Sequence, residues 1–537
     1  MLSYRKLAMR VLGRPLHTEG IDSPRPASQR AAALVLTAAM LTTLAAPAFA
    51  DIWHIENGDI TISAGESGNN VTQNNNTTYG DTNTIITNQN KDTASSNTVT
   101  IETNDKNDTV EVTLKDVNID TSSRNKAAVS VTGEGDTNIK LDGDNALKSD
   151  IYRSGIYGSG SGSLTISGGE NDSLTAQGGS GANGISSSGS LTISGGTVTA
   201  NGDDGGRGIS SSGSVTISGG STVTANGGSG TISGGDGIWS GGGVTISGGS
   251  TVTANGGNGG SLVGGDGIRS GGGLTVSDGT VTAKGGNGDS KDGYGGDGIR
   301  SGGVVTISGN TVNAAGGYGG KVGGYGICSF DRVAISGGTV EAAGGNGSTG
   351  GGSGIYSSVI DLSGSLELTA KAGSPNGKAL SQKGSELVLD TIKDKLGPGA
   401  KVTATDADGK VIDQVSTPRP VEPEESSSSS GGGSAAPSAP ASPLPGLTVT
   451  DKDGQRISYT STQSGNTLTV CVGRFTASFR ISLAALRQLR AEGIETIAFQ
   501  TILCSTTLSV DELLAMGGED AEAVLTHRFT DSSLTVG

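Results

Sequence analysis

Apolar and polar residues alternate along most of this chain in short runs. From about residue 97 the runs NTVTIET, DTVEVTLKDVNID, AAVSVTG and TNIKLDG place Val, Ile or Leu at every second position. Such alternation is typical of a β-strand that has one buried and one solvent-facing side. The pattern therefore predicts a structure built from many short strands.

A longer repeat is superimposed on this alternation between residues 155 and 357. A Gly-Ile step, a VTIS-like strand, a TVTA-like strand and a glycine-rich loop follow one another eight times. The anchoring isoleucines, at separations of 24 to 31 residues, are Ile156, Ile185, Ile209, Ile238, Ile268, Ile299, Ile327 and Ile355. Repeats of this length are typical of stacked solenoids, so each is predicted to form one triangular, three-stranded coil. The variation in length falls mainly in the glycine-rich loop, which is expected to leave the stack.

Outside the repeats, the chain divides into further regions. A basic leader, an apolar run and the motif Ala48-Phe49-Ala50 predict a cleaved export signal over residues 1–50. Residues 51–96 are expected to form an N-terminal cap or irregular first coil, and residues 97–415 the solenoid.

The remaining residues are predicted to form a linker and a second domain. Residues 416–446 hold seven of the thirteen prolines and suggest an extended linker. Residues 447–537 have ordinary composition and are predicted to form a small α+β domain. Its two helices are expected to begin after Ser482 and Ser509, which are good N-cap residues.

The net negative charge of the chain argues against one class of binding partner, the nucleic acids. The chain carries −16, and six basic and two acidic residues lie in the export signal, so the mature chain carries −20. Nucleic-acid binding depends mainly on Lys and Arg and is therefore not expected. The apolar run of the leader is too short for a confident membrane span. We expect an extracellular or cell-surface protein that is monomeric and does not insert into the membrane.

Cysteine and histidine are scarce. Cys328, Cys471 and Cys504 do not make a disulfide framework, and a Cys471–Cys504 bridge and two free thiols are both compatible with export. Only His54 and His527 follow the leader, which leaves little for histidine-based catalysis or a histidine metal site.

The segment from Thr109 to Ser149 carries a family resemblance. It reads TVEVTLKDVNID…AAVSVTGEGDTNIKLDGDNALKS, is followed by GSLTISGG, and resembles bacterial secreted proteins with carbohydrate-binding domains. Those proteins are similar to right-handed parallel β-helix proteins, and the likeness covers roughly residues 97–390. It implies an all-β fold, a right-handed parallel β-helix with coils of 24–31 residues, followed here by the small α+β domain. It also implies a non-catalytic, adhesin-like surface protein that binds an extracellular polysaccharide or glycan.

Candidate binding residues follow the anchoring isoleucines. Because neighbours along a strand face opposite sides, these residues are predicted to form one outward ladder. Trp239, Arg269 and Arg300 are the main carbohydrate-binding candidates, with Tyr157 and Tyr356 beside them. An aromatic ring offers an apolar face to a sugar, and a guanidinium can bind hydroxyls or acidic sugars. The alternative is that this outward position collects unrelated residues and that Trp239 only covers a corner.

Three carboxylates recur two positions before the isoleucines, at Asp236, Asp266 and Asp297. In successive coils they would repel one another unless a positive charge lies between them. Ca²⁺, which takes oxygen ligands, is one candidate and the only cofactor suggested. Arginines of the same repeats are the other candidate, and Asp is also common in glycine-flanked turns.

No catalytic residue is predicted. β-Helix proteins include polysaccharide lyases and hydrolases, which use grouped carboxylates with Arg or Lys. Here Asp and Arg recur with the repeat, as structural residues do. The alternatives to a non-catalytic binder are a polysaccharide-degrading enzyme, which would depend on Asp266 or Asp297, and a purely structural spacer.

Overall fold

The computed structural model describes residues 51–418 and most of residues 447–536, with gaps at 451–455, 458, 465, 473–476, 502–504, 517–520 and 528–531. The chain forms two compact units that divide near residue 424, and each is described by itself. The predicted export signal lies outside the described residues, as does all but the first three residues of the predicted linker.

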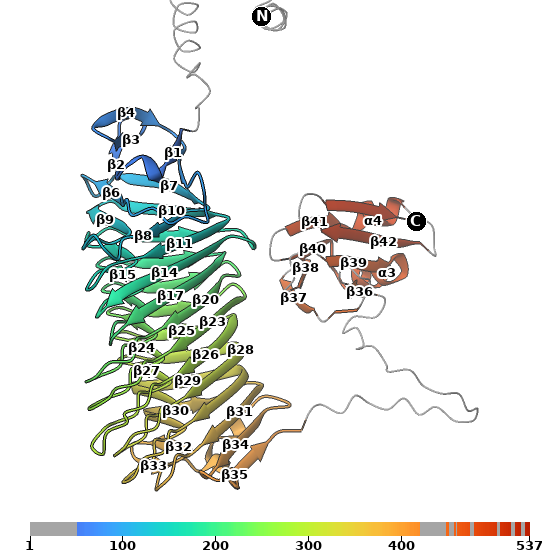
Figure 1. The fold of residues 1–537 in the computed structure, drawn as a ribbon. Helices are drawn as coiled ribbons and strands as arrows, with labels where there is room; N and C mark the ends of the chain where they lie inside the picture. Colours follow the sequence, from blue (N-terminus) through green and yellow to red (C-terminus); the bar gives the residue numbers. More distant parts are fainter. Residues whose placement is uncertain are drawn as a thin grey trace, which may run out of the picture. The chain divides into compact units, whose positions relative to one another are not determined.

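The first unit confirms the predicted fold class. Parallel coils stack into a β-helix of about 13 turns (Figure 1). Each regular turn contributes one strand to each of three parallel ladders, and residues at equivalent repeat positions pair with one another. Ile238, for example, pairs with Ile209 on one side and Ile268 on the other.

The first ladder contains the Gly-Ile strands: β2 (Ile60–Gly65), β6 (Val99–Thr103), β9 (Val129–Gly133), β12 (Ile156–Gly158), β15 (Ile185–Ser187), β18 (Ile209–Ser211), β21 (Ile238–Ser240), β24 (Ile268–Ser270), β27 (Ile299–Ser301), β29 (Ile327–Ala343), β30 (Ile355–Leu362) and β32 (Leu380–Gln382). The second contains the VTIS-like strands: β1 (Ile52–His54), β5 (Thr84–Thr87), β7 (Thr109–Lys115), β10 (Asp136–Asp142), β13 (Leu164–Ser167), β16 (Leu191–Ser194), β19 (Val215–Ser218), β22 (Val244–Ile246), β25 (Leu274–Val276), β28 (Val305–Ala315) and later parts of β29 and β30. The third contains the TVTA-like strands: β8 (Asn118–Asp120), β11 (Asp144–Lys148), β14 (Ser173–Ser180), β17 (Thr197–Asp203), β20 (Thr222–Asn226), β23 (Ser250–Asn255), β26 (Gly279–Lys284), the ends of β28 and β29, β31 (Leu366–Lys371) and β34 (Lys401–Thr405).

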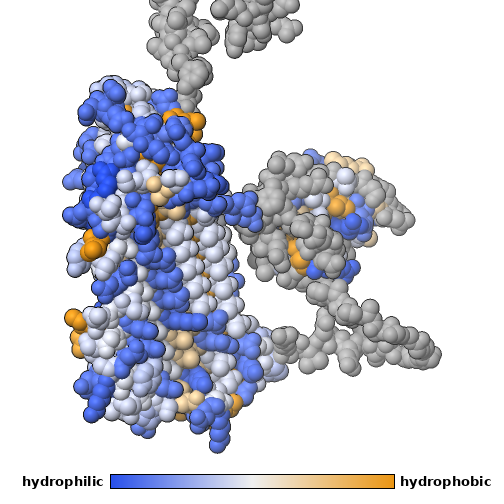
Figure 2. Space-filling view, in the orientation of Figure 1, coloured by the Kyte–Doolittle hydropathy of each residue, from blue (hydrophilic) through white to orange (hydrophobic). Residues whose placement is uncertain are grey.

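The interior of the stack is filled by columns of aliphatic side chains. In one coil Ile238, Val244, Ile246 and Val252 are fully buried or nearly so, Ser240 and Ser250 at the corners are also buried, and the alternate strand residues Trp239, Thr245, Thr251 and Thr253 face outward. Each such side chain stabilises the fold by roughly 1.5–3 kcal/mol through burial. Outward positions carry mostly Thr, Ser and Gly, and Figure 2 shows a surface of mainly polar or neutral residues on the displayed side.

Both ends of the stack are closed by irregular elements. At the N-terminal end, β1 and β2 already join the parallel ladders, a short 3₁₀ turn (Ile55–Asn57) lies between them, and β3 (Gly68–Gln73) and β4 (Asn76–Asp81) form antiparallel pairs. Residues 51–96 thus form an irregular first coil. At the other end lie β33 (Ser385–Glu386), the 3₁₀ helix Leu389–Lys395 and β35 (Val411–Ser416), which pairs antiparallel with β34.

The prediction that the glycine-rich loops leave the stack is wrong, because the bases of these loops are hydrogen-bonded into it. Gly257 N donates to Gly235 O, Gly265 N to Gly257 O and Gly286 N to Gly265 O, each at 2.8 Å. This zigzag of hydrogen bonds between the two legs of successive loops continues as far as Gly373. A Cβ on Gly265 would lie 1.9 Å from Gly235 O, so only glycine permits the approach. The loops differ in length at their tips, beyond this hydrogen-bonded base.

Among its described residues, the second unit forms two four-stranded sheets and two helices. One sheet has the order β36 (Leu447–Thr450), β39 (Ala477–Ser482), β42 (Glu522–His527) and β43 (Ser532–Val536); the other has β37 (Thr460–Ser464), β38 (Thr467–Cys471), β40 (Thr496–Gln500) and β41 (Ser505–Ser509). The helices are α3 (Leu483–Ala491) and α4 (Val510–Met516), both where the sequence predicts them. Ser482 Oγ accepts a hydrogen bond from Ala485 N at 3.2 Å and Ser509 Oγ accepts one from Glu512 N at 3.4 Å, as N-caps do.

Two further features of the described residues bear on the sequence analysis. Cys504 lies outside them, and Cys471 Sγ lies 3.3 Å from Gln500 Oε1. None of the helices described is both long and apolar enough to cross a membrane.

The glycine zigzag predicts a local sensitivity to a single methyl group. We expect Gly265→Ala to lower the thermal midpoint of the β-helix, because overpacking costs about 1–3 kcal/mol. Tryptophan fluorescence is the appropriate measurement, because both tryptophans, Trp53 and Trp239, lie in this unit. Gly350→Ala is the matched control, since a Cβ there would meet nothing closer than 3.9 Å. Equal midpoints for the two variants would contradict the argument.

The second unit is expected to lose stability in acid. His527 is fully buried, its Nε2 lies 2.9 Å from Thr506 Oγ1, and burial lowers its pKa from the ordinary value of 6.5. The unfolded state therefore binds a proton more readily, and this contribution to stability, complete above pH 6.5, is lost as the pH falls below it. The urea midpoint followed by NMR signals of β40 should fall between pH 7.5 and 5. A midpoint that does not fall would show that His527 contributes no such dependence.

Candidate functional site

The predicted outward ladder exists in the parallel register. Its members, each paired with the next, are Tyr157, Ser186, Ser210, Trp239, Arg269, Arg300, Cys328 and Tyr356. We call the surface formed by this ladder and the residues just before it the Gly-Ile face. The coils are about 4.8 Å apart, so a ligand that lies along the axis meets one member per coil.

Two members of the ladder do not face solvent as expected. Cys328 is 1% exposed and Ser210 is 7% exposed. Both are short side chains next to long ones, Cys328 between Arg300 and Tyr356 and Ser210 beside Trp239. Long neighbours only one coil away cover a short side chain even where it points outward. Burial is the main reason that the pKa of the Cys328 thiol rises to about 12, so the thiol stays protonated.

A hollow of about 560 Å³ lies on the Gly-Ile face. Arg207, Arg269 and Arg300 line it together with Asp236 and Asp266, and the loop residues Ser233 and Val263 also contribute. The structure therefore brings together two predicted binding arginines and two predicted metal ligands. Trp239, Tyr157 and Tyr356 are not among the residues that line this hollow, although Arg207, which contacts the indole of Trp239, is.

Trp239 is held in place by an arginine that the sequence analysis treated only as a counter-ion. The guanidinium of Arg207 lies over the indole ring, 4.5 Å from its centroid, and Arg207 Nε donates to Asp236 Oδ2 at 3.2 Å. A cation over an aromatic face is attracted by the ring electrons. The indole is half-buried as a result and not fully exposed, which also fixes its orientation.

The three aspartates form a ladder of their own. Asp236 Oδ1 accepts from Asp266 N at 2.9 Å, Asp266 Oδ1 from Asp297 N at 2.7 Å, and Asp297 Oδ1 from Tyr325 N at 2.7 Å. Each carboxylate thus caps the equivalent position of the next coil. Asn183 does the same for Arg207 N at 2.8 Å, so the role requires an acceptor and not a charge.

Burial raises the pKa of two of these carboxyl groups, those of Asp266 and Asp297. It raises the pKa of Asp297 to about 6, and backbone and arginine contacts oppose the rise. Burial, followed by repulsion from Asp297 and Asp236, raises the pKa of Asp266 well above its ordinary value. The lining of the hollow holds three arginines and two aspartates, so it is net positive, and protonation of Asp266 makes it more so.

The counter-ions observed are arginines. Arg207 pairs with Asp236 at 3.2 Å, and Arg300 Nη1 lies 3.6 Å from Asp297 Oδ2. No three His, Cys, Asp or Glu side chains of the described residues are grouped as ligands of one metal ion. Asp236, Asp266 and Asp297 therefore do not form a grouped set of calcium ligands, because each of them directs one oxygen at a backbone N–H.

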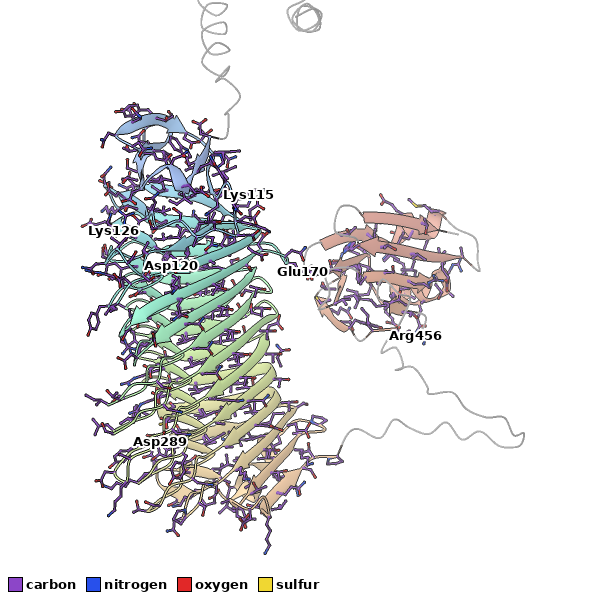
Figure 3. The ribbon with its side chains drawn as sticks, viewed as in Figure 1. Lys115, Asp120, Lys126, Glu170, Asp289 and Arg456 are labelled. Carbon is purple, nitrogen blue, oxygen red and sulfur yellow. The ribbon has the colours of Figure 1, made fainter. Side chains whose placement is uncertain are left out.

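The other two candidate aromatic residues lie elsewhere on the same face. Tyr356 is stacked on Tyr325 with ring centroids 4.9 Å apart, so one side of its ring is covered. Tyr157 is 43% exposed and lines a second hollow of about 330 Å³ with Lys126, Arg153 and Asn125. Figure 3 labels Lys126 among the first coils.

Arg207, Lys126 and Arg153 are functional candidates that the sequence analysis did not select. They lie in the turns before the Gly-Ile strands, where the repeats differ in length. The signal in the sequence was that Arg207 occupies the aspartate position of its own repeat. Its contact with Trp239 of the next coil follows only from the register.

Neutralising Asp266 is expected to stabilise the β-helix. Because its folded pKa lies above the value of about 3.9 in an unfolded chain, its ionisation opposes folding as the pH rises above 4. Asp266→Asn keeps the acceptor, as Asn183 does, and removes the charge. In thermal scans followed by tryptophan fluorescence, the midpoint of the variant should be higher than that of the parent at pH 8 and equal to it at pH 3. Asp289→Asn, on an exposed loop, is the control. A variant that melts below the parent at pH 8 would refute this.

Comparison with known proteins identifies no relative of the chain. No family model matches it, and neither a curated protein nor a solved structure does.

Proposed function

We propose that this is an exported, non-catalytic carbohydrate-binding protein of the cell surface or extracellular medium, with an adhesin-like role. The binding site is the larger hollow of the Gly-Ile face together with the adjacent Trp239, and the ligand is an extracellular glycan. The leader sequence and the resemblance to secreted carbohydrate-binding proteins support export and ligand class.

The observation that carries the proposal is the pairing of Trp239 with a free cation. Arg269 follows Trp239 in the ladder, is exposed and forms no ion pair with any described residue. Arg207 and Arg300, by contrast, are both neutralised by aspartates. An indole and an unpaired guanidinium on neighbouring strands, which lie about 4.8 Å apart, supply an apolar edge and a strong donor set for one sugar.

The carboxylates of the hollow favour binding over catalysis. General acid–base chemistry on a glycosidic bond needs two carboxyl groups that reach the substrate. Asp236, Asp266 and Asp297 are each 4–6% exposed and use one oxygen to hold the next coil. The raised pKa values of Asp266 and Asp297 are explained mainly by burial in the repeat, without a catalytic role.

The test is glycan binding by the full chain and by matched variants. We expect selective binding to one class in a panel of neutral and acidic glycans, and a loss of at least tenfold in affinity for Arg269→Ala, since a hydrogen bond to a charged group contributes about 1.5–3 kcal/mol. Trp239→Ala should weaken binding similarly. Arg332→Ala is the control, because Arg332 is equally exposed and lines neither hollow.

Three outcomes would contradict the proposal. Absence of binding to every glycan would favour a structural spacer. New reducing or unsaturated ends in the ligand, lost on Asp266→Asn, would establish an enzyme. Binding that Arg269→Ala leaves unchanged would place the site elsewhere.

A further inference from the structure

Each hollow of the Gly-Ile face spans several coils, and the two hollows follow one another along the axis. The smaller one ends at Tyr157 in the coil of Ile156, and the larger one begins at Gly181 and Asn183 in the coil of Ile185. The strands of these coils, β12 and β15, pair directly. No coil therefore separates the two hollows.

Only small side chains of the ladder stand between the two aromatic rings. Ser186 and Ser210 occupy the two positions between Tyr157 and Trp239, and Ser210 is buried. The rings are three coil steps apart, or roughly 14 Å. From Thr100, in the smaller hollow, to Arg300, in the larger, there are seven steps, or about 34 Å. The face thus offers a long path along the axis on which the ladder is small between the two rings, at Ser186 and Ser210, and large at Tyr157, Trp239, Arg269 and Arg300.

Arginine side chains, though not lysines, are concentrated on this path. Residues 51–418 contain six arginines, and four of them line the hollows: Arg153, Arg207, Arg269 and Arg300. The chain as a whole carries −16. A cationic surface on an acidic protein attracts anions locally while the remainder repels them.

One unpaired guanidinium lies in each hollow. Arg153 donates to Asn125 Oδ1 at 3.2 Å and, like Arg269, forms no ion pair with the residues the structure describes. Lys126, by contrast, is paired with Asp59 at 2.9 Å. The coils of Arg153 and Arg269 are four steps apart, roughly 19 Å. Two free guanidiniums at this separation suit two carboxylates of one extended ligand, because guanidinium binds carboxylate with two parallel hydrogen bonds.

We infer that the two hollows form one binding track for an extended acidic polysaccharide, laid along the axis of the β-helix, whose sugar carboxylates meet Arg153 and Arg269. The inference rests on the proposed function, since it names the class of glycan and adds a second subsite. The coil separation of about 4.8 Å is close to the advance of an extended pyranose chain per sugar, so successive sugars meet successive coils. Tyr157 and Trp239 each offer a ring edge or face to a sugar of the same chain.

The test is the dependence of affinity on ligand length. Calorimetry of the full chain would use oligomers of mannuronic acid from two to ten sugars, with neutral cello-oligomers of equal length. Engagement of a second hollow by the same ligand acts through effective concentration. We therefore expect the longest acidic oligomers to bind at least tenfold more tightly than trimers. The double variant Arg153→Ala/Tyr157→Ala should lose this gain and bind trimers as the parent does. Tyr79→Ala, a highly exposed tyrosine of β4 outside both hollows, is the control.

The possible results distinguish failure of the shared binding track from failure of the proposed Trp239 site. A gain that survives in the double variant, or no gain with length, would overturn the shared track and leave the Trp239 site standing. Equal affinity for the neutral oligomers would overturn the acidic class. Equal affinity for poly-glutamate of matched charge would overturn recognition of sugar. If no oligomer of either series binds, and the glycan panel is also negative, the proposed function fails together with the track.

Discussion

The close parallel stacking of coils is the constraint on which the rest of this structure depends. Neighbouring coils are about 4.8 Å apart, so each residue contacts the residue at the same repeat position in the coils on either side. A side chain therefore fits only if it packs against the side chains at that position in both neighbouring coils. Columns of Ile238 and its equivalents meet this condition through apolar contact. The glycine loops meet it by having no side chain, which lets Gly235, Gly257 and Gly265 bond backbone to backbone.

The same constraint governs charge. An aspartate repeated in successive coils places like charges one coil apart, and burial adds the cost of desolvation. The chain offsets this in three ways: Oδ1 of each carboxylate accepts a backbone N–H, arginines pair with Asp236 and Asp297, and the pKa values of Asp266 and Asp297 are raised. Because the arginines do not titrate, the arrangement leaves positive charge on one face of an acidic protein, and that charge is the basis of our proposal for ligand binding.

The candidate site therefore consists of single residues that differ from the other residues at the same position of the repeat. Trp239, Arg269 and Arg300 replace the serines found earlier in the same column, and Arg207 replaces the acceptor found at Asn183 and Asp236. Substitution in one column changes the surface without disturbing the core, because ladder and core residues alternate along each strand. A β-helix can thus acquire a binding path by point changes at a regular spacing.

The sequence by itself determined the coil, its three strands, the inward aliphatic columns and the outward ladder, because strand alternation and repeat period are local properties of the chain. It also located α3 and α4 through their caps. The tertiary structure alone decided which outward residues are accessible: Cys328 and Ser210 are covered by long neighbours from adjacent coils, and Trp239 by Arg207. It alone showed that the glycine loops pack into the stack and that the hollow lined by Tyr157 and the hollow lined by Arg269 follow one another along the axis. These features depend on contacts between residues of different coils or loop legs, such as Arg207 and Trp239, and the local pattern of the sequence does not show where those side chains and loops meet.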